Sequence, residues 1–97
     1  MFISVRRYKV NPADVPEISK RAQEGFVPIM KGSPGFVAYY GVDHGNGDVA
    51  TVSIFESQAQ AEETNNRAAG WVKENLASLV PNPPEIITGD ILWSAMR

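Results

Sequence analysis

The stretch FVAYYGVDHGNGDVATVSIFES, residues 36–57, decides the fold of this chain. Two segments rich in β-branched and aromatic residues, 36–42 and 48–56, flank the loop His44-Gly45-Asn46-Gly47. Such segments favour strands, and a loop of about four residues rich in Gly and Asn favours a hairpin between them. The sequence therefore predicts an antiparallel hairpin in the middle of the chain.

A strand and a helix are predicted before the hairpin. Residues 2–10, FISVRRYKV, contain no breaker before Asn11-Pro12, as is typical of a strand followed by a turn. Asp14 and Glu17 have the spacing of a capping box, and apolar residues follow along one helical face at Val15, Ile18, Ala22, Phe26 and Ile29. Pro28 lacks an amide proton and crowds the carbonyl of Glu24, so we expect an irregular last turn.

A second helix and a fourth strand are predicted after the hairpin. Ser57 and Gln60 form another possible capping box, and the helix is expected to run to Val80, with a weak point at 66–70. Its inward stripe comprises Ala61, Asn65, Ala68, Val72, Leu76 and Leu79. Residues 85–96, EIITGDILWSAM, are expected to form the strand, with a bulge at Gly89-Asp90.

This order, βαββαβ, predicts an α+β ferredoxin-like fold with a four-stranded antiparallel sheet, in one domain spanning residues 1–97. Right-handed crossovers put both helices on the same face of the sheet. The other face also carries apolar residues in three predicted strands, including Ala38, Val42, Val52, Ile54 and Ile87. An apolar face of this size is unusual for a soluble monomer. We therefore expect a homodimer in which two sheets pack face to face.

Composition excludes several functional classes. A net charge of −2 provides no basic surplus for nucleic acid. The absence of cysteine excludes disulfides and thiolate sites, and the single histidine, His44, excludes a multi-histidine metal site. The longest run without charge, residues 32–42, is too short to span a membrane, and the N-terminus does not resemble a signal peptide. We expect a cytoplasmic protein.

The stretch PGFVAYY after an amphipathic helix, followed by IFES at the start of a second helix, resembles the antibiotic-biosynthesis-monooxygenase-type family. The resemblance implies a dimeric α/β barrel. Activities in that family include cofactor-independent oxidation of polycyclic phenols, haem degradation and quinol oxidation, so the resemblance implies the fold more strongly than the reaction.

Haem degradation is not supported by the residues of this chain. Haem-degrading relatives use an Asn on the first strand, a Trp at the end of the third strand and a His on the second helix. At the corresponding places this chain has Ser4, Arg6 and Arg7, then Phe55, and a second helix without histidine. His44 lies in the predicted hairpin loop, so no axial histidine is available, and we expect no cofactor.

Relatives that oxidise phenols without a cofactor need an apolar slot and a few polar groups that stabilise the substrate anion. The candidate catalytic residues are Asn65, Arg6 and Tyr40. The candidate substrate-binding residues are Tyr8, Tyr39, Trp71 and Trp93.

Each candidate also has a structural explanation. Tyr39 and Tyr40 point to opposite sheet faces, so one of them is expected in the dimer core. Trp71 and Trp93 could simply pack, and Asn65 could make a structural hydrogen bond. A buried arginine would need a carboxylate such as Glu56 or Asp90.

Two functions therefore remain open. The first is a cofactor-independent, monooxygenase-like protein that binds a small aromatic or apolar molecule. The second is a dimeric ligand-binding or stress-associated domain without enzymatic activity.

Overall fold

The computed structural model describes all 97 residues. Its strands are β1 (Phe2–Lys9), β2 (Phe36–Gly45), β3 (Asp48–Phe55) and β4 (Glu85–Asp90). Its helices are the 3-10 turn η1 (Pro12–Asp14), α1 (Val15–Arg21), the π-helical turn η2 (Ala22–Phe26), α2 (Val27–Lys31) and α3 (Gln58–Asn75). None of these helices combines the length and the apolar character that a membrane crossing requires.

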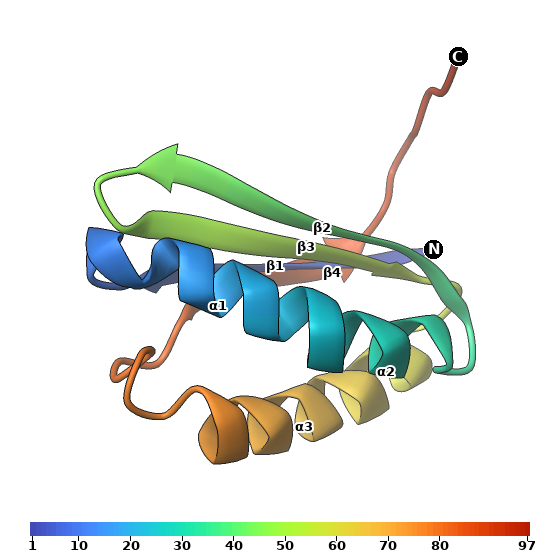
Figure 1. The fold of residues 1–97 in the computed structure, drawn as a ribbon. Helices are drawn as coiled ribbons and strands as arrows, with labels where there is room; N and C mark the ends of the chain where they lie inside the picture. Colours follow the sequence, from blue (N-terminus) through green and yellow to red (C-terminus); the bar gives the residue numbers. More distant parts are fainter.

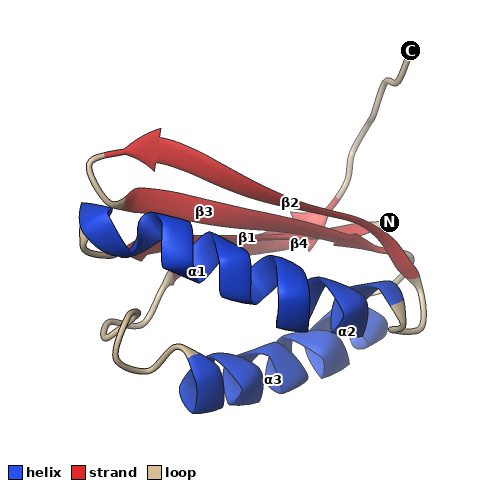
Figure 2. Ribbon diagram, viewed as in Figure 1, coloured by secondary structure: helices blue, strands red, loops and turns tan.

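The four strands form one antiparallel sheet in the order β2-β3-β1-β4. Figure 2 shows the helices together on one side of this sheet, which leaves the opposite face without a covering layer. We call that opposite side the open face. This arrangement confirms the α+β ferredoxin-like fold class.

The first helical region bends where the sequence predicts an irregular turn. Between α1 and α2 the backbone widens into η2, where the amide of Val27 bonds to the carbonyl of Ala22, five residues back. This widening lies directly before Pro28, which cannot donate a helical hydrogen bond and whose ring would crowd the preceding turn. The predicted capping box is not formed, because Asn11 caps η1 and Glu17 pairs with Arg21 instead.

The predicted cap of α3 at Ser57 is confirmed, although the Gln60 side chain accepts from the Ser57 hydroxyl and not from its amide. The Ser57 hydroxyl accepts a hydrogen bond from the amide of Gln60, and the Gln60 side chain lies where a Cβ on Gly35 would be. Gly35 has a φ of +76°, so a side chain there is excluded both by space and by conformation. The helix is continuous through residues 66–70, so the predicted weak point is not a break.

The C-terminal end of α3 differs from the prediction. The helix stops at Asn75 instead of Val80, and Asn75 shows why. Its side chain donates to the carbonyl of Trp71, and its own carbonyl accepts from Arg21 of α1 and not from the next turn of the helix. Residues 76–84 then return to the sheet as a turn and a loop.

A bulge in β2 changes the predicted assignment of its faces. The register shifts between Phe36 and Ala38, so Phe36 is paired with Phe55 and packs on the helix side with Tyr39. A regular strand alternates without interruption, so without the bulge Phe36 would lie on the same face as Tyr40.

The last strand is shorter than predicted. β4 ends at Asp90, without the predicted bulge at Gly89-Asp90, and the remaining residues form an extended tail that leaves the body of the protein (Figure 1). The amide of Ile91 still bonds to the carbonyl of Met1. Beyond it, the apolar side chains of Leu92, Trp93 and Met96 are exposed.

The core occupies one end of the space between sheet and helices. It consists of Phe2, Phe26, Met30, Phe55, Ala61 and Ala68. Phe2 and Phe55 are opposite each other in the β1–β3 register, at the end of the sheet where α3 begins. Helix and sheet are therefore held together at this end.

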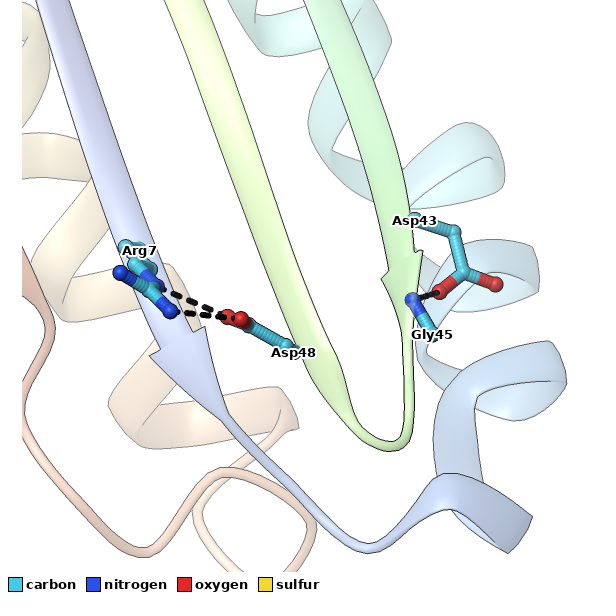
Figure 3. A network of polar contacts seen from close by, with 4 residues as sticks. All are labelled: Arg7, Asp43, Gly45 and Asp48. Atoms are coloured by element: carbon cyan, nitrogen blue, oxygen red, sulfur yellow. Dashed lines mark hydrogen bonds and ion pairs between the residues drawn. The ribbon is translucent and has the colours of Figure 1, made fainter.

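An ion pair fixes the other end of the β1–β3 pair on the open face (Figure 3). The Arg7 guanidinium donates from Nε and Nη2 to the two carboxylate oxygens of Asp48, at 2.9 and 2.6 Å. This two-pronged geometry lowers the pKa of Asp48, chiefly through the hydrogen bonds to Arg7. Asp48 is buried, whereas the Arg7 side chain is largely exposed.

The Arg7–Asp48 pair predicts a pH-dependent stability. The folded-state pKa of Asp48 is depressed, so its contribution is present above the ordinary Asp pKa of about 4 and is lost as the pH falls through the lower folded-state value. Asp48→Asn should therefore lower the free energy of unfolding at neutral pH. In strong acid the variant and the wild-type protein should have nearly the same free energy of unfolding. Urea unfolding of both proteins across this pH range measures the difference. A deficit that is independent of pH would contradict the assignment.

Candidate functional site

A cavity of about 410 Å³ lies between the sheet and the helices, beyond the core. Most of the 25 residues that line it are hydrophobic. Its floor is the helix-facing side of β1, β2 and β3, and its roof comes from α1, η2, α2 and α3. Apolar walls with a small number of polar groups are typical of small-molecule sites.

The floor consists of three rows of residues across the strands. The register aligns Tyr39 with Ser53 and Ser4, then Gly41 with Thr51 and Arg6, and finally Asp43 with Val49 and Tyr8. In the middle row Gly41 has no side chain, and no atom lies within 4 Å of where its Cβ would be. The floor is therefore left open at Gly41, beside Thr51, and Arg6 lies on the other side of Thr51.

Three aromatic rings connect the floor with the roof. The Phe26 ring packs edge-on against Tyr39, with ring centroids 5.5 Å apart, and lies 5.3 Å from the ring centroid of Trp71. Trp71 in turn fits against the backbone of Gly25, where an added Cβ would come within 2.9 Å of the indole. Gly25 thus lets η2 and α3 approach closely and sets the position of Trp71.

Tyr39 is a neutral hydrogen-bonding group at physiological pH. Burial raises its pKa to about 12, and the neighbouring Tyr8 acts in the same direction. Thr51 and the positive charge of Arg6 act in the opposite direction, but the effect of burial is larger. The Tyr39 phenol therefore keeps its proton and can donate it to a ligand oxygen.

Arg6 carries a positive charge on the cavity floor without a protein partner. Its Nε atom is buried and has no hydrogen-bond partner. Neither carboxylate suggested by the sequence reaches it, since Glu56 is exposed beyond the end of β3 and Asp90 lies opposite Phe2 in the register. An unpaired buried donor costs about 1–3 kcal/mol, so a bound ligand that accepts this hydrogen bond would recover that energy.

Asn65 lies on the roof. It is half-buried on α3 and lines the cavity. The side-chain hydrogen bonds of α3 are made by Ser57, Gln58, Gln60, Glu62 and Asn75 with their neighbours, and Asn65 takes part in none of them. Asn65 therefore does not make the structural hydrogen bond that was its alternative explanation, and its side-chain amide remains available to a ligand.

The structure brings most, but not all, of the predicted site residues together. The cavity is lined by Arg6, Tyr8, Tyr39, Asn65 and Trp71. Tyr40 lies on the open face with 58% of its surface exposed, because neighbouring residues of β2 alternate between faces. Trp93 lies in the C-terminal tail and is 83% exposed, because β4 ends before it. Neither Tyr40 nor Trp93 belongs to this cavity.

Three residues of the floor were missed from the sequence. They are Gly41, Thr51 and Ser53. A signal was present, because Thr51 and Ser53 alternate with apolar residues in β3 and so place two hydroxyls on the helix-facing side. Gly41 stands out only in the register, as the neighbour of Thr51.

The chemistry of the lining is that of anion stabilisation. It contains one guanidinium, two phenols and the two amides of Gln23 and Asn65, and it has no histidine. Its only carboxylate is Asp43, at the hairpin end of the floor. Asp43 accepts a hydrogen bond from the amide of Gly45 at 2.9 Å (Figure 3). No three His, Cys, Asp or Glu side chains are placed to hold a metal ion.

Comparison with known proteins identifies the fold. No family model matches the chain, and neither does any curated protein. Among solved structures, a protein of unknown function from Nitrosomonas europaea superposes with a TM-score of 0.83 at 18% identity, over 99% of this chain and 93% of its own. A monooxygenase from Streptomyces coelicolor, solved with nanaomycin D, superposes with a TM-score of 0.79 at 20% identity, over 99% and 91%.

A haem degrader from Mycobacterium tuberculosis, solved with two haems in its active site, also has this fold. Its TM-score is 0.77 at 17% identity, over 99% of this chain and all of its own. The lining of the present cavity has neither histidine nor cysteine, two of the side chains that commonly hold haem iron. The resemblance inferred from the sequence is confirmed at the level of the fold, which this chain shares with proteins of the antibiotic-biosynthesis-monooxygenase type.

Proposed function

We propose that this protein is a cofactor-independent, monooxygenase-like enzyme that binds a small aromatic molecule between the helices and the sheet. The observation that carries the proposal is the cavity itself, in which the unpaired Arg6 and Asn65 face apolar walls. The aromatic residues Trp71 and Phe26, which pack on each other, line the same cavity and are suited to contact a planar substrate. The shared fold with monooxygenases supports the same conclusion.

The reaction we propose uses the substrate as its own reductant. A phenol with an open ring position reacts with O₂ to give a quinone and water. One oxygen atom enters the ring, the other leaves as water, and the substrate supplies the electrons and both hydrogens. The protein then only has to bind the ring, favour its ionised form and exclude water.

The predicted site residues that line the cavity have separate roles in this scheme. Arg6 stabilises the ionised oxygen of the substrate. From the roof of the cavity, the side-chain amide of Asn65 donates a hydrogen bond to an oxygen that becomes negatively charged during the reaction. The phenols of Tyr8 and Tyr39 orient the substrate, and Trp71 stacks on its ring. Tyr40 and Trp93 have no role here, since they lie outside the cavity.

The alternative is a binding protein without catalytic activity. It is favoured by one observation, the position of Asp43 as the only carboxylate of the lining, at the hairpin end and already bonded to Gly45. A site with no base inside it can hold an aromatic anion without turning it over.

Oxygen uptake separates the two functions. Purified protein is incubated with a panel of phenols and quinols while dissolved oxygen and absorbance are recorded. Turnover is expected with at least one compound, and Asn65→Ala should lower its rate by about 100-fold, as for the loss of one donor to a developing oxyanion. Asn66→Ala is the matched control, because Asn66 is the exposed neighbour on α3. No uptake with any compound would favour the binding protein.

We also propose that two copies associate through the open face. Tyr40, Val42 and Ile87 are exposed on that face, and the exposed apolar tail residues Leu92 and Trp93 continue from β4 beside it. A second copy supplies both a matching apolar face and a matching tail, so one two-fold contact would cover all of them.

Sedimentation velocity at micromolar concentration tests this association. We expect the wild-type protein to sediment as a dimer and Ile87→Glu to sediment as a monomer, because the charge would be buried without a partner. Thr88→Glu is the control, since Thr88 is exposed on the other side of the same strand. A monomeric wild-type protein would overturn the proposal.

A further inference from the structure

We infer that the cavity takes its ligand as an anion, a planar aromatic molecule whose ionised oxygen is bound by Arg6. This inference rests on the proposed site and specifies the charge of what enters it. It concerns the ground state of the ligand, before any reaction, and so applies to an enzyme and to a binding protein alike.

The charges of the cavity favour an anion. Arg6 is the only cationic side chain in the lining, and Asp43 is the only anionic one. Arg6 lies in the middle row of the floor, between Thr51 and Ile86 in the register, whereas Asp43 lies at the hairpin end. A ligand over the middle of the floor therefore meets a positive charge surrounded by apolar walls, where electrostatic attraction is strong.

Arg6 differs from two other arginines of the chain in having no carboxylate. Arg7 is bound by Asp48 and Arg21 by Glu17, at 2.6 and 2.8 Å. The buried Nε of Arg6 has no partner of any kind. A guanidinium presents a planar fork that matches a carboxylate or an ionised ring oxygen, so the unpaired fork is suited to bind one.

The neighbouring groups are compatible with a bound anion. Tyr39 keeps its proton, so it can donate to an anionic oxygen and cannot repel it as a phenolate. The missing side chain of Gly41 leaves room on the far side of Thr51 for the ring of a ligand whose oxygen is bound by Arg6. Because the lining has no base away from the hairpin end, a ligand that is already ionised, or one that Arg6 ionises, fits the site better than a neutral one.

Calorimetric titration with matched naphthalene ligands tests the inference. The probes are 2-naphthoate, its neutral isostere naphthalene-2-carboxamide, and 2-naphthol, measured at neutral pH and at a pH where the naphthol ionises. We expect 2-naphthoate to bind about 10- to 100-fold more tightly than the carboxamide, the range typical of hydrogen bonds to a charged group. If an ionised phenol is the natural ligand, the affinity for 2-naphthol should increase on ionisation by a larger factor than the ratio of the naphthoate and carboxamide affinities.

Variants assign the preference to one residue. Arg6→Gln should bring the ratio of the naphthoate and carboxamide affinities close to one. Arg67→Gln, which removes the same charge from an exposed position of α3, should leave the ratio unchanged. Arg6→Lys keeps the charge but loses the fork and should give an intermediate ratio, so it replaces Arg6→Gln if that variant does not fold.

The outcomes separate this inference from the proposed reaction. Equal affinity of wild-type protein for naphthoate and carboxamide, no binding of any probe, or a ratio that Arg6→Gln leaves unchanged would overturn the inference. Oxygen uptake with a ligand that stays neutral would support the proposed reaction and contradict the inference that the ligand is an anion. Selective anion binding without oxygen uptake would support the inference and the binding protein.

Discussion

The rest of the structure depends on the packing contacts of the Phe26 ring. It belongs to the buried core, and the same ring touches Tyr39 on the sheet and Trp71 on α3. On one side of it the interior is filled by Phe2 and Phe55, and on the other side the helices stand away from the sheet over Arg6 and Thr51. The chain thus has a rigid end that holds its elements together and a hollow end that can hold a ligand.

Two adjacent residues of β1 show how strand alternation separates structure from function. Arg7 faces the open side and is neutralised by Asp48, which fixes β1 to β3 beside the hairpin. Arg6 faces the helices and has no such partner. The same residue type therefore stabilises the fold at one position and is free to bind a ligand at the next. The difference arises from the pairing register, because only Arg7 has a carboxylate within reach on its face.

Local patterns predicted the order of the elements, the hairpin and the cap of α3, because each depends on residues close in sequence. They also placed Asn65 on the inner face of α3, since helical spacing determines that. They did not predict the bulge that turns Phe36 inward, or the end of β4 before Trp93, because both depend on pairing with a neighbouring strand. The importance of Gly41 and the unpaired state of Arg6 became evident only when distant strands were aligned.

We propose that the hollow between the helices and the sheet is a binding site whose positive centre is Arg6. The most direct measurement is a two-dimensional ¹H–¹⁵N spectrum that resolves the arginine Nε and tryptophan Nε1 groups, recorded as 2-naphthoate is added. The account predicts that the Arg6 Nε–H signal shifts downfield and that the Trp71 indole shifts with it, while the Arg7 and Trp93 signals change little. Shifts confined to Arg7, Trp93 or other surface groups, with Arg6 and Trp71 unchanged, would contradict it.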